Sequence, residues 1–323
     1  MFHAKEALDS DVVYAGVVTW DKNRYWNVRL MKDGKLVSRK VFSKCYYGEE
    51  GWKAAEAFRQ SESDLHGLTL RRPIVPLPTQ QYIAGFIDGD GCFTMYKDGT
   101  TRVHIAQAQD DGVPPVLAFI QRWYGGVMSR PRRRAATRRL SHALELWGPE
   151  AIWLMRDFLG VGILKREEAS DGLRARQVAV ADRSEIIASS RMAKKLTTKR
   201  SLVVSEADPR LTWAYISGLF DAEGCVLFKG TPSCVLSQLS NPSVLECIRR
   251  KLGDGNVNYE TGTFRVHSDM AVAFARKILP YSIAKAEQLN HLLFCRAIQT
   301  ASVISQYSIF KELCAKLNEM KRK

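Results

Sequence analysis

Apolar and polar residues recur along most of the chain in two spacings, one typical of helices and one typical of strands. From residue 79 these spacings predict a short apolar helix, two strands, a helix, two more strands and a further helix, and the same order returns after residue 200. Within 101–108, alternation predicts a strand with one buried and one polar face. The pattern therefore predicts an α+β chain with two similar halves, 79–200 and 201–323.

Residues 1–63 follow a different pattern. Short strands are predicted at 14–20, 25–31 and 36–42, with turn residues between them, and a helix is predicted at 49–60. We expect these residues to form a small domain of their own, a three-stranded sheet with one helix. Residues 64–78 end in a proline-rich stretch and are expected to be an extended linker.

Two segments of the chain nearly repeat each other, YIAGFIDGDGC at Tyr82–Cys92 and YISGLFDAEGC at Tyr215–Cys225. Such a repeat indicates that one supersecondary unit is used twice. Small residues within each apolar helix would let the two helices pack closely, which would bring Asp90 and Glu223 together. A single copy would more simply be a core helix followed by a turn. Two copies with acids in register favour a divalent cation bound over a phosphodiester.

Composition and charge limit the kinds of binding partner that the chain is expected to have. The chain has 48 Lys and Arg residues against 34 Asp and Glu, a formal net charge of +14, which favours nucleic acid or an anionic surface. No apolar run is long enough to span a membrane, so a membrane partner is not expected. Its 7 cysteines, an odd number without a CxxC pair, indicate free thiols in a reducing intracellular compartment, nucleus or organelle.

The two repeated segments resemble the signature helices of the LAGLIDADG homing endonucleases, and the resemblance extends over the element order of 79–323. It implies two pseudo-symmetric αββαββα halves whose curved antiparallel sheets form a saddle over DNA. The implied activity is site-specific cleavage of both DNA strands by metal-dependent phosphodiester hydrolysis, the reaction behind intron mobility. Two non-identical halves in one chain imply a monomer that reads a long, asymmetric duplex.

The same resemblance assigns the metal ligands to the ends of the two repeats. The family's catalytic acid is the last one before the final glycine, which corresponds to Asp90 and Glu223. Mg²⁺ is the expected ion, and the main-chain carbonyls of Gly89 and Ala222 are implied as further ligands. The earlier acid of each repeat is expected to be a structural part of the helix end.

A lysine and a polar side chain in each half complete the implied active site. Lys165 in ILKREE and Lys285 in IAKAEQ occupy corresponding places. A lysine beside the scissile phosphate would stabilise developing negative charge, and an ordinary exposed helix lysine is the open alternative. The matching polar candidates are Gln109 and Gln238, although the first half has extra residues before its helix, which leaves the register of Gln238 open.

Further residues are expected to contact DNA. Residues 1–63 resemble the AP2 family of DNA-binding domains, which place a sheet in the major groove; the matching positions are Trp20, Arg24, Trp26, Arg29 and Arg39. A solvated strand face with core tryptophans is the alternative interpretation. In the two halves the candidates are Arg102, His104, Gln238 and Arg265, together with the arginine run Arg130, Arg132, Arg133, Arg134, Arg138 and Arg139. The run suits phosphate contact, and a localisation patch or a solvated loop are its alternatives.

Two other functions stay open. The chain would be a non-cleaving regulator if an AP2-like domain read the sequence and the nuclease fold served only as a clamp. It would be an RNA-binding intron maturase if the same fold served splicing. The presence of both acids argues against the first alternative, whereas the sequence discriminates poorly against the second.

Overall fold

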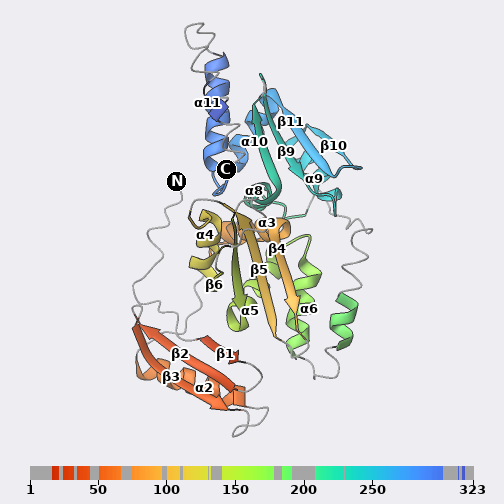
Figure 1. The fold of residues 1–323 in the computed structure, drawn as a ribbon. Helices are drawn as coiled ribbons and strands as arrows, with labels where there is room; N and C mark the ends of the chain where they lie inside the picture. Colours follow the sequence, from red (N-terminus) through yellow and green to blue (C-terminus); the bar gives the residue numbers. More distant parts are fainter. Residues whose placement is uncertain are drawn as a thin grey trace.

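The computed structural model describes residues 17–21, 25–32, 35–43, 51–66, 75–96, 100–109, 112–129, 131, 140–177, 184–190, 208–228, 230–300, 312 and 315–316. Within these ranges it contains two four-stranded antiparallel sheets and one three-stranded antiparallel sheet, each accompanied by helices (Figure 1). The predicted α+β fold is confirmed.

The two halves repeat one order of elements. The first half consists of α3 (Leu77–Asp90), β4 (Gly91–Met95), β5 (Thr101–Ala108), α4 (Pro115–Tyr124), β6 (Val127–Met128), β7 (Ser141–Trp147), α5 (Gly148–Val161) and α6 (Arg166–Gln177). The second consists of α8 (Trp213–Glu223), β8 (Gly224–Phe228), β9 (Pro232–Ser237), α9 (Ser243–Leu252), β10 (Asn256–Asn258), β11 (Thr263–His267), α10 (Ser268–Ile278) and α11 (Ala286–Thr300). The αββαββα order predicted for each half is therefore present.

The two sheets share one strand order, so their positions can be matched residue by residue. The first sheet runs β4-β5-β7-β6 and the second β8-β9-β11-β10. Gly91, which starts β4, pairs with Ile105, and Gly224, which starts β8, pairs with Leu236. A residue that lies a given number of positions from Ile105 in the first half therefore corresponds to the residue that lies the same number of positions from Leu236 in the second half.

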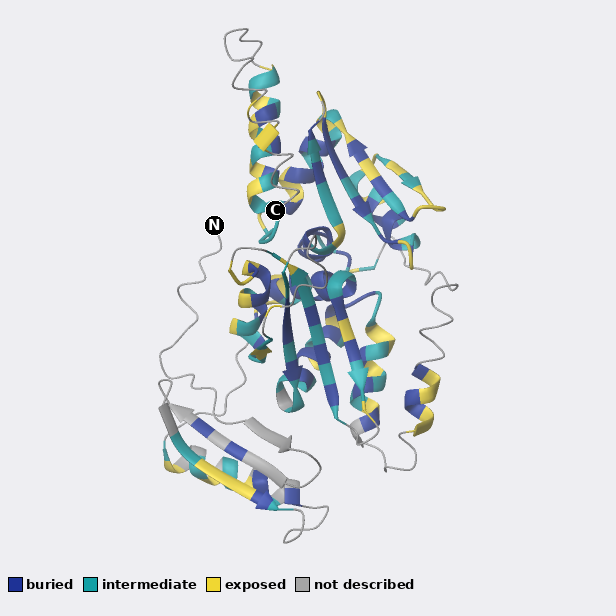
Figure 2. Cartoon of the chain, viewed as in Figure 1, coloured by how far each residue is buried: buried dark blue, intermediate teal, exposed yellow. Residues whose placement is uncertain are grey.

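Burial follows the alternation that the sequence predicts. In β5, Val103 and Ile105 are buried, whereas Arg102 and His104 between them stay partly exposed. Figure 2 shows the same banding in dark blue and teal along the strands of both sheets. Each sheet thus has one face in the core and one face left open.

Helices α3 and α8 pack against each other between the two sheets (Figure 1). A glycine on each helix makes this approach possible. A Cβ added to Gly85 would lie 1.9 Å from the carbonyl oxygen of Tyr215, and one added to Gly218 would lie 1.9 Å from that of Tyr82. No larger residue fits at either place, because the two backbones are in direct contact.

The N-terminal part forms β1 (Val17–Asp21), β2 (Tyr25–Lys32), β3 (Lys35–Ser43) and α2 (Gly51–Leu65). Val28, Leu30, Phe42 and Ala55 form its own buried cluster. Three strands and one helix were predicted here, and all four elements are present, although α2 extends beyond the predicted end at residue 60.

The stretch expected to be a linker is helical at both ends. Helix α2 continues to Leu65, and α3 already begins at Leu77. Pro76 precedes α3 and Pro78 stands in its first turn, where the missing N–H of proline has no helical partner to lose. The prolines therefore start a helix rather than extend the linker.

No helix in the described ranges is long and apolar enough to cross a membrane.

Candidate active site

The two repeated acids lie at the ends of the crossing helices. Asp90 is the last residue of α3 and Glu223 the last of α8. A Cβ added to Gly89 would lie 2.4 Å from the Cβ of Ala222 and 3.1 Å from the Cγ of Glu223. The Glu223 side chain therefore borders the residue that precedes Asp90. The close helix crossing brings the two acids together, as the repeat predicts.

Burial and a neighbouring negative charge hold Asp90 partly protonated. Burial of its carboxyl raises the pKa of Asp90 to about 7, and the charge of Glu223 adds to the shift, while Lys285 and Lys165 oppose it. A carboxyl with a pKa near 7 is about half protonated at neutral pH, and the charge of Glu223 adds to the effect of burial. A cation held between the two carboxyls would favour their charged forms.

One lysine from each half reaches the end of its signature helix. Lys165 Nζ donates to the carbonyl oxygens of Ile87 at 2.8 Å, Gly89 at 3.0 Å and Gly91 at 2.6 Å. Lys285 Nζ donates to the carbonyl oxygen of Asp221. Burial lowers the pKa of both lysines, and nearby aspartates partly compensate. These bonds hold each ammonium group at the end of its own signature helix, near Asp90 and Glu223.

The earlier acid of each repeat anchors a loop. Asp88 accepts hydrogen bonds from the main-chain N–H groups of residues 163, 164 and 165 at 2.8 to 3.0 Å. Asp221 accepts from the N–H groups of residues 283 and 284 and from the Ser282 hydroxyl. These bonds place Lys165 and Lys285 against the helix ends. The expected structural role of Asp88 and Asp221 thus has a geometric basis.

Two tyrosines that were not among the predicted site residues connect the halves at this point. Tyr82 on α3 donates to Asp221 at 2.7 Å, and Tyr215 on α8 donates to Asp88 at 2.6 Å. Each tyrosine is the first residue of its repeat, so the repeat itself contains the signal. The four residues form a symmetric pair of buried hydrogen bonds across the helix crossing.

Replacing Tyr215 by phenylalanine should destabilise the chain by about 2 kcal/mol, because it removes a buried hydrogen bond in which the Asp88 carboxylate is the acceptor. Burial raises the pKa of Asp88, and the Tyr215 bond lowers it. Its loss would raise the pKa of Asp88 further, so the destabilisation should grow as the pH rises. Denaturant unfolding at pH 5 and pH 8 would measure this difference. Tyr96→Phe, at a 37%-exposed residue, is the control and should change stability by less than about 0.5 kcal/mol. A loss equal at both pH values would contradict the charge argument.

The strand register changes the assignment of the polar candidates. Gln238 lies two residues beyond Leu236, and the matching position two residues beyond Ile105 is Gln107, not Gln109. The pairing of Gln109 with Gln238 is therefore wrong, because the loop between the first two strands spans 96–100 in the first half and only 229–231 in the second. Gln107 Oε1 is buried and has no hydrogen-bond partner in the described ranges. The sequence contains this signal only if the difference in length between the two strand–strand loops is taken into account, because Gln107 then aligns with Gln238.

The predicted DNA contacts fall into four groups. Arg102, His104 and Arg265 lie on the open faces of the two sheets. Gln238 is buried, and its Oε1 accepts a hydrogen bond from Ser240 at 2.6 Å, so it would have to exchange that bond to contact DNA. In the N-terminal sheet Trp20 pairs with Trp26 and Arg29 with Arg39, and Arg39 is exposed. Outside the described residues are Arg24, Arg130, Arg132, Arg133, Arg134, Arg138 and Arg139.

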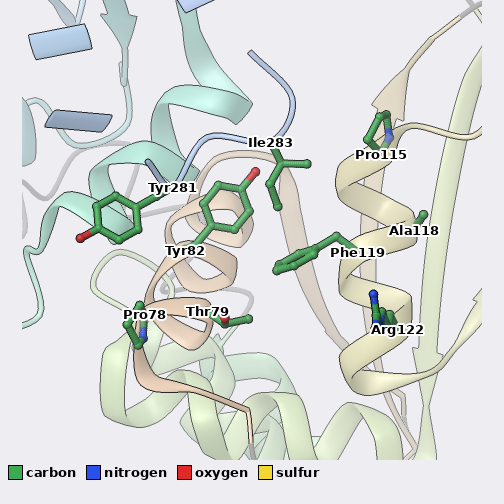
Figure 3. A pocket seen from close by; sticks show the side chains of 9 residues that line it. All are labelled: Pro78, Thr79, Tyr82, Pro115, Ala118, Phe119, Arg122, Tyr281 and Ile283. Carbon is green, nitrogen blue, oxygen red and sulfur yellow. The ribbon is translucent and has the colours of Figure 1, made fainter. Parts of the chain in front are cut away.

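A separate hollow of about 360 Å³ lies beside the crossing helices (Figure 3). Its apolar walls come from the start of α3, from α4 and from the loop after α10; Tyr82, Phe119, Tyr281 and Ile283 are among the residues that line it. Neither the two acids nor the two lysines line it. The hollow is therefore distinct from the candidate active site.

The fold occurs in known DNA-bound proteins. The LAGLIDADG meganuclease I-AabMI bound to uncleaved DNA aligns with a TM-score of 0.50 and 16% identity over 75% of this chain and 98% of that chain. I-CpaMI bound to uncleaved DNA gives a TM-score of 0.52 and 13% identity, over 74% and 97%. I-SmaMI, bound to its uncleaved target in the presence of calcium ions, gives 0.51 and 11%, over 74% and 98%.

At these identities the likeness shows the fold, and the chain has the fold of LAGLIDADG meganucleases. No protein-family model matches the chain, and no curated protein matches its sequence. The roles of the individual site residues and the AP2-like nature of the N-terminal domain therefore stay predictions.

Proposed function

We propose that the chain is a site-specific DNA endonuclease that hydrolyses phosphodiester bonds in both strands of a long, asymmetric duplex. One observation supports this most strongly: Asp90 and Glu223 converge at the α3–α8 crossing, with one lysine held beside each helix end. The meganucleases that share the fold are bound to uncleaved DNA. The excess of positive charge, +14 overall, fits a nucleic-acid partner.

The donor set fits a hard divalent cation such as Mg²⁺. No three His, Cys, Asp or Glu side chains gather into a metal cluster within the described ranges, but Mg²⁺ typically needs only one or two carboxylates, with water and substrate phosphate as its other ligands. Asp90 and Glu223 would hold it, together with the carbonyls of Gly89 and Ala222. Gly89 O would have to be shared with Lys165, which already donates to it. When bound, such a cation neutralises phosphoryl oxygens and lowers the pKa of an attacking water.

The remaining polar groups would act on the substrate directly. Lys165 and Lys285 would place a positive charge beside the scissile phosphates, where negative charge develops during hydrolysis. Gln107 and Gln238, at matching positions beyond the first strand pair of each half, would order water near each phosphate. The buried Oε1 of Gln107, which lacks a partner in the described ranges, fits an acceptor for such a water.

The N-terminal domain would increase the affinity for the target without taking part in the chemistry. Its sheet and its exposed Arg39 fit an AP2-like DNA contact. Two DNA-binding modules on one chain raise the effective concentration of the second module once the first is bound. Removal of residues 1–63 should therefore weaken binding but leave cleavage of the bound target.

A cleavage selection tests the proposed function. The full chain would be incubated with Mg²⁺ and a plasmid library carrying randomised duplex, and linear molecules sharing one sequence are expected. Selective binding without any cleavage would support the regulator instead. Preferential binding of intron RNA over duplex DNA in a competition assay would support the maturase.

A further inference from the structure

Four side chains on the open face of the first sheet form one cluster. Arg102 on β5 lies over the ring of Trp147 on β7, with 5.3 Å between its guanidinium carbon and the ring centre. Tyr96 stacks on Trp147, with ring centres 5.7 Å apart and an interplanar angle of 23°. Glu145 accepts a 3.3 Å hydrogen bond from Trp147 Nε1 and lies 3.8 Å from Arg102 Nη1. The cluster fixes the orientation of the arginine.

In the part of the chain that the structure describes, the Arg102 guanidinium donates no hydrogen bond to another protein group. Its Nε is buried and has no hydrogen-bond partner in the described ranges. The 3.8 Å contact with Glu145 is longer than a hydrogen bond. A buried donor without a partner is costly unless a ligand satisfies it. The Arg102 side chain is 25% exposed, so its outer Nη groups are left for an acceptor outside the chain.

The neighbouring carboxylate selects the kind of acceptor. A phosphate would approach Arg102 beside the negative charge of Glu145, and like charges at such distances repel. The O6 and N7 atoms of guanine are neutral acceptors that match the guanidinium fork. The cluster is therefore better suited to a base edge in the major groove than to the backbone.

The second half lacks this arrangement. By the strand register, Ser233 corresponds to Arg102, Arg265 to Glu145 and His267 to Trp147. Arg265 is exposed, and the position that matches Trp147 is occupied by His267 and not by an indole ring. The matching residues of the second half do not repeat the cluster, and Arg265 provides for comparison an arginine on the open face of the other sheet.

We propose that Arg102 reads one guanine of the target in the major groove, with Glu145 and Trp147 as positioning residues, so that the first half requires a G·C pair at one place. This inference rests on the proposed DNA-binding function, since it requires the open sheet face to lie on DNA. It goes further by naming the base, the residue that reads it and the residue that keeps that arginine from phosphate.

Binding selection on a randomised duplex library, with Ca²⁺ in place of Mg²⁺ to prevent cleavage, tests the inference. The full wild-type chain should enrich one sequence with a G·C pair preferred by about 10- to 100-fold at one position. Arg102→Ala should remove that preference and leave the others, and Arg102→Gln should shift it towards adenine. Arg265→Ala should leave the guanine preference intact. Thermal unfolding of each variant checks that it is folded.

Glu145→Gln separates positioning from folding. It should lower the guanine preference and steepen the salt dependence of binding by up to about 0.9 log units per log unit, because the arginine becomes able to contact phosphate. If Arg102→Ala weakens binding equally for all sequences, the arginine contacts phosphate and the inference is wrong. If the folded wild-type chain enriches no duplex sequence at all, the proposed function fails, and the inference fails with it.

Discussion

Replacement of Asp90 by asparagine, or of Glu223 by glutamine, is expected to abolish double-strand cleavage while duplex binding changes little. Each change removes one of the two carboxylates that converge at the α3–α8 crossing. Loss of a metal-binding carboxylate should lower the cleavage rate by more than about a hundredfold. The sheet faces that would contact DNA are untouched, so affinity should be retained. Cleavage of a selected target and its binding in Ca²⁺ would be measured side by side.

The same substitution at Asp90 should stabilise the metal-free protein at high pH. The pKa of Asp90 is about 7 in the folded chain, against about 4 for an unfolded aspartate. Between these values the folded state binds the extra proton, so the stability of the wild type falls as the pH rises from about 4 to 7. Asparagine does not ionise, so the variant does not lose this part of its stability as the pH rises.

In the absence of divalent ions, the melting temperature of Asp90→Asn should therefore exceed that of the wild type by more at pH 8 than at pH 4. The difference in unfolding free energy should reach about 2 to 4 kcal/mol. Added Mg²⁺ should stabilise the wild type but not the variant. Normal cleavage by either acid variant would contradict the metal assignment, and a melting difference that does not change with pH would contradict the protonation argument.

Gly85→Ala and Gly218→Ala are expected to be the most destabilising single changes to the helix crossing. In each case the added Cβ would lie 1.9 Å from a carbonyl oxygen of the opposite helix, so the helices would have to separate. We expect a loss of at least about 3 kcal/mol in unfolding free energy. The ends of α3 and α8 would also move apart, so cleavage should fall even where the variant remains folded.

Gly160→Ala is the matched control for these two variants. Gly160 also lies in a helix, α5, but it is exposed and has no atom within 4 Å of an added Cβ. Alanine there should be neutral or stabilising by up to about 1 kcal/mol, since it restricts the unfolded chain. Equal stability changes at all three glycines would show that helix propensity, and not helix contact, determines the result.

The order of helices and strands and the approach of the two acids could be predicted from the amino-acid sequence. The spacing of apolar residues depends on local geometry, so the helices and strands of both halves could be predicted from it, with the exception of α6. The repeat placed small residues and acids at matching points of two helices. Because the two helices cross closely, Asp90 and Glu223 at their ends lie near each other. Pro76 and Pro78 misled the prediction of the linker, because proline suits both an extended chain and a helix start.

Which residues meet across different helices and strands depends on the three-dimensional packing. The match between Gln107 and Gln238 depends on hairpin length and strand register, neither of which can be read from a local pattern. The bonds from Tyr82 to Asp221 and from Tyr215 to Asp88 join residues more than a hundred positions apart. Arg102, Glu145 and Trp147 form one cluster because β5 and β7 are neighbours in the sheet. The chemistry of each residue is local, but the partner that gives it a role is set by long-range packing.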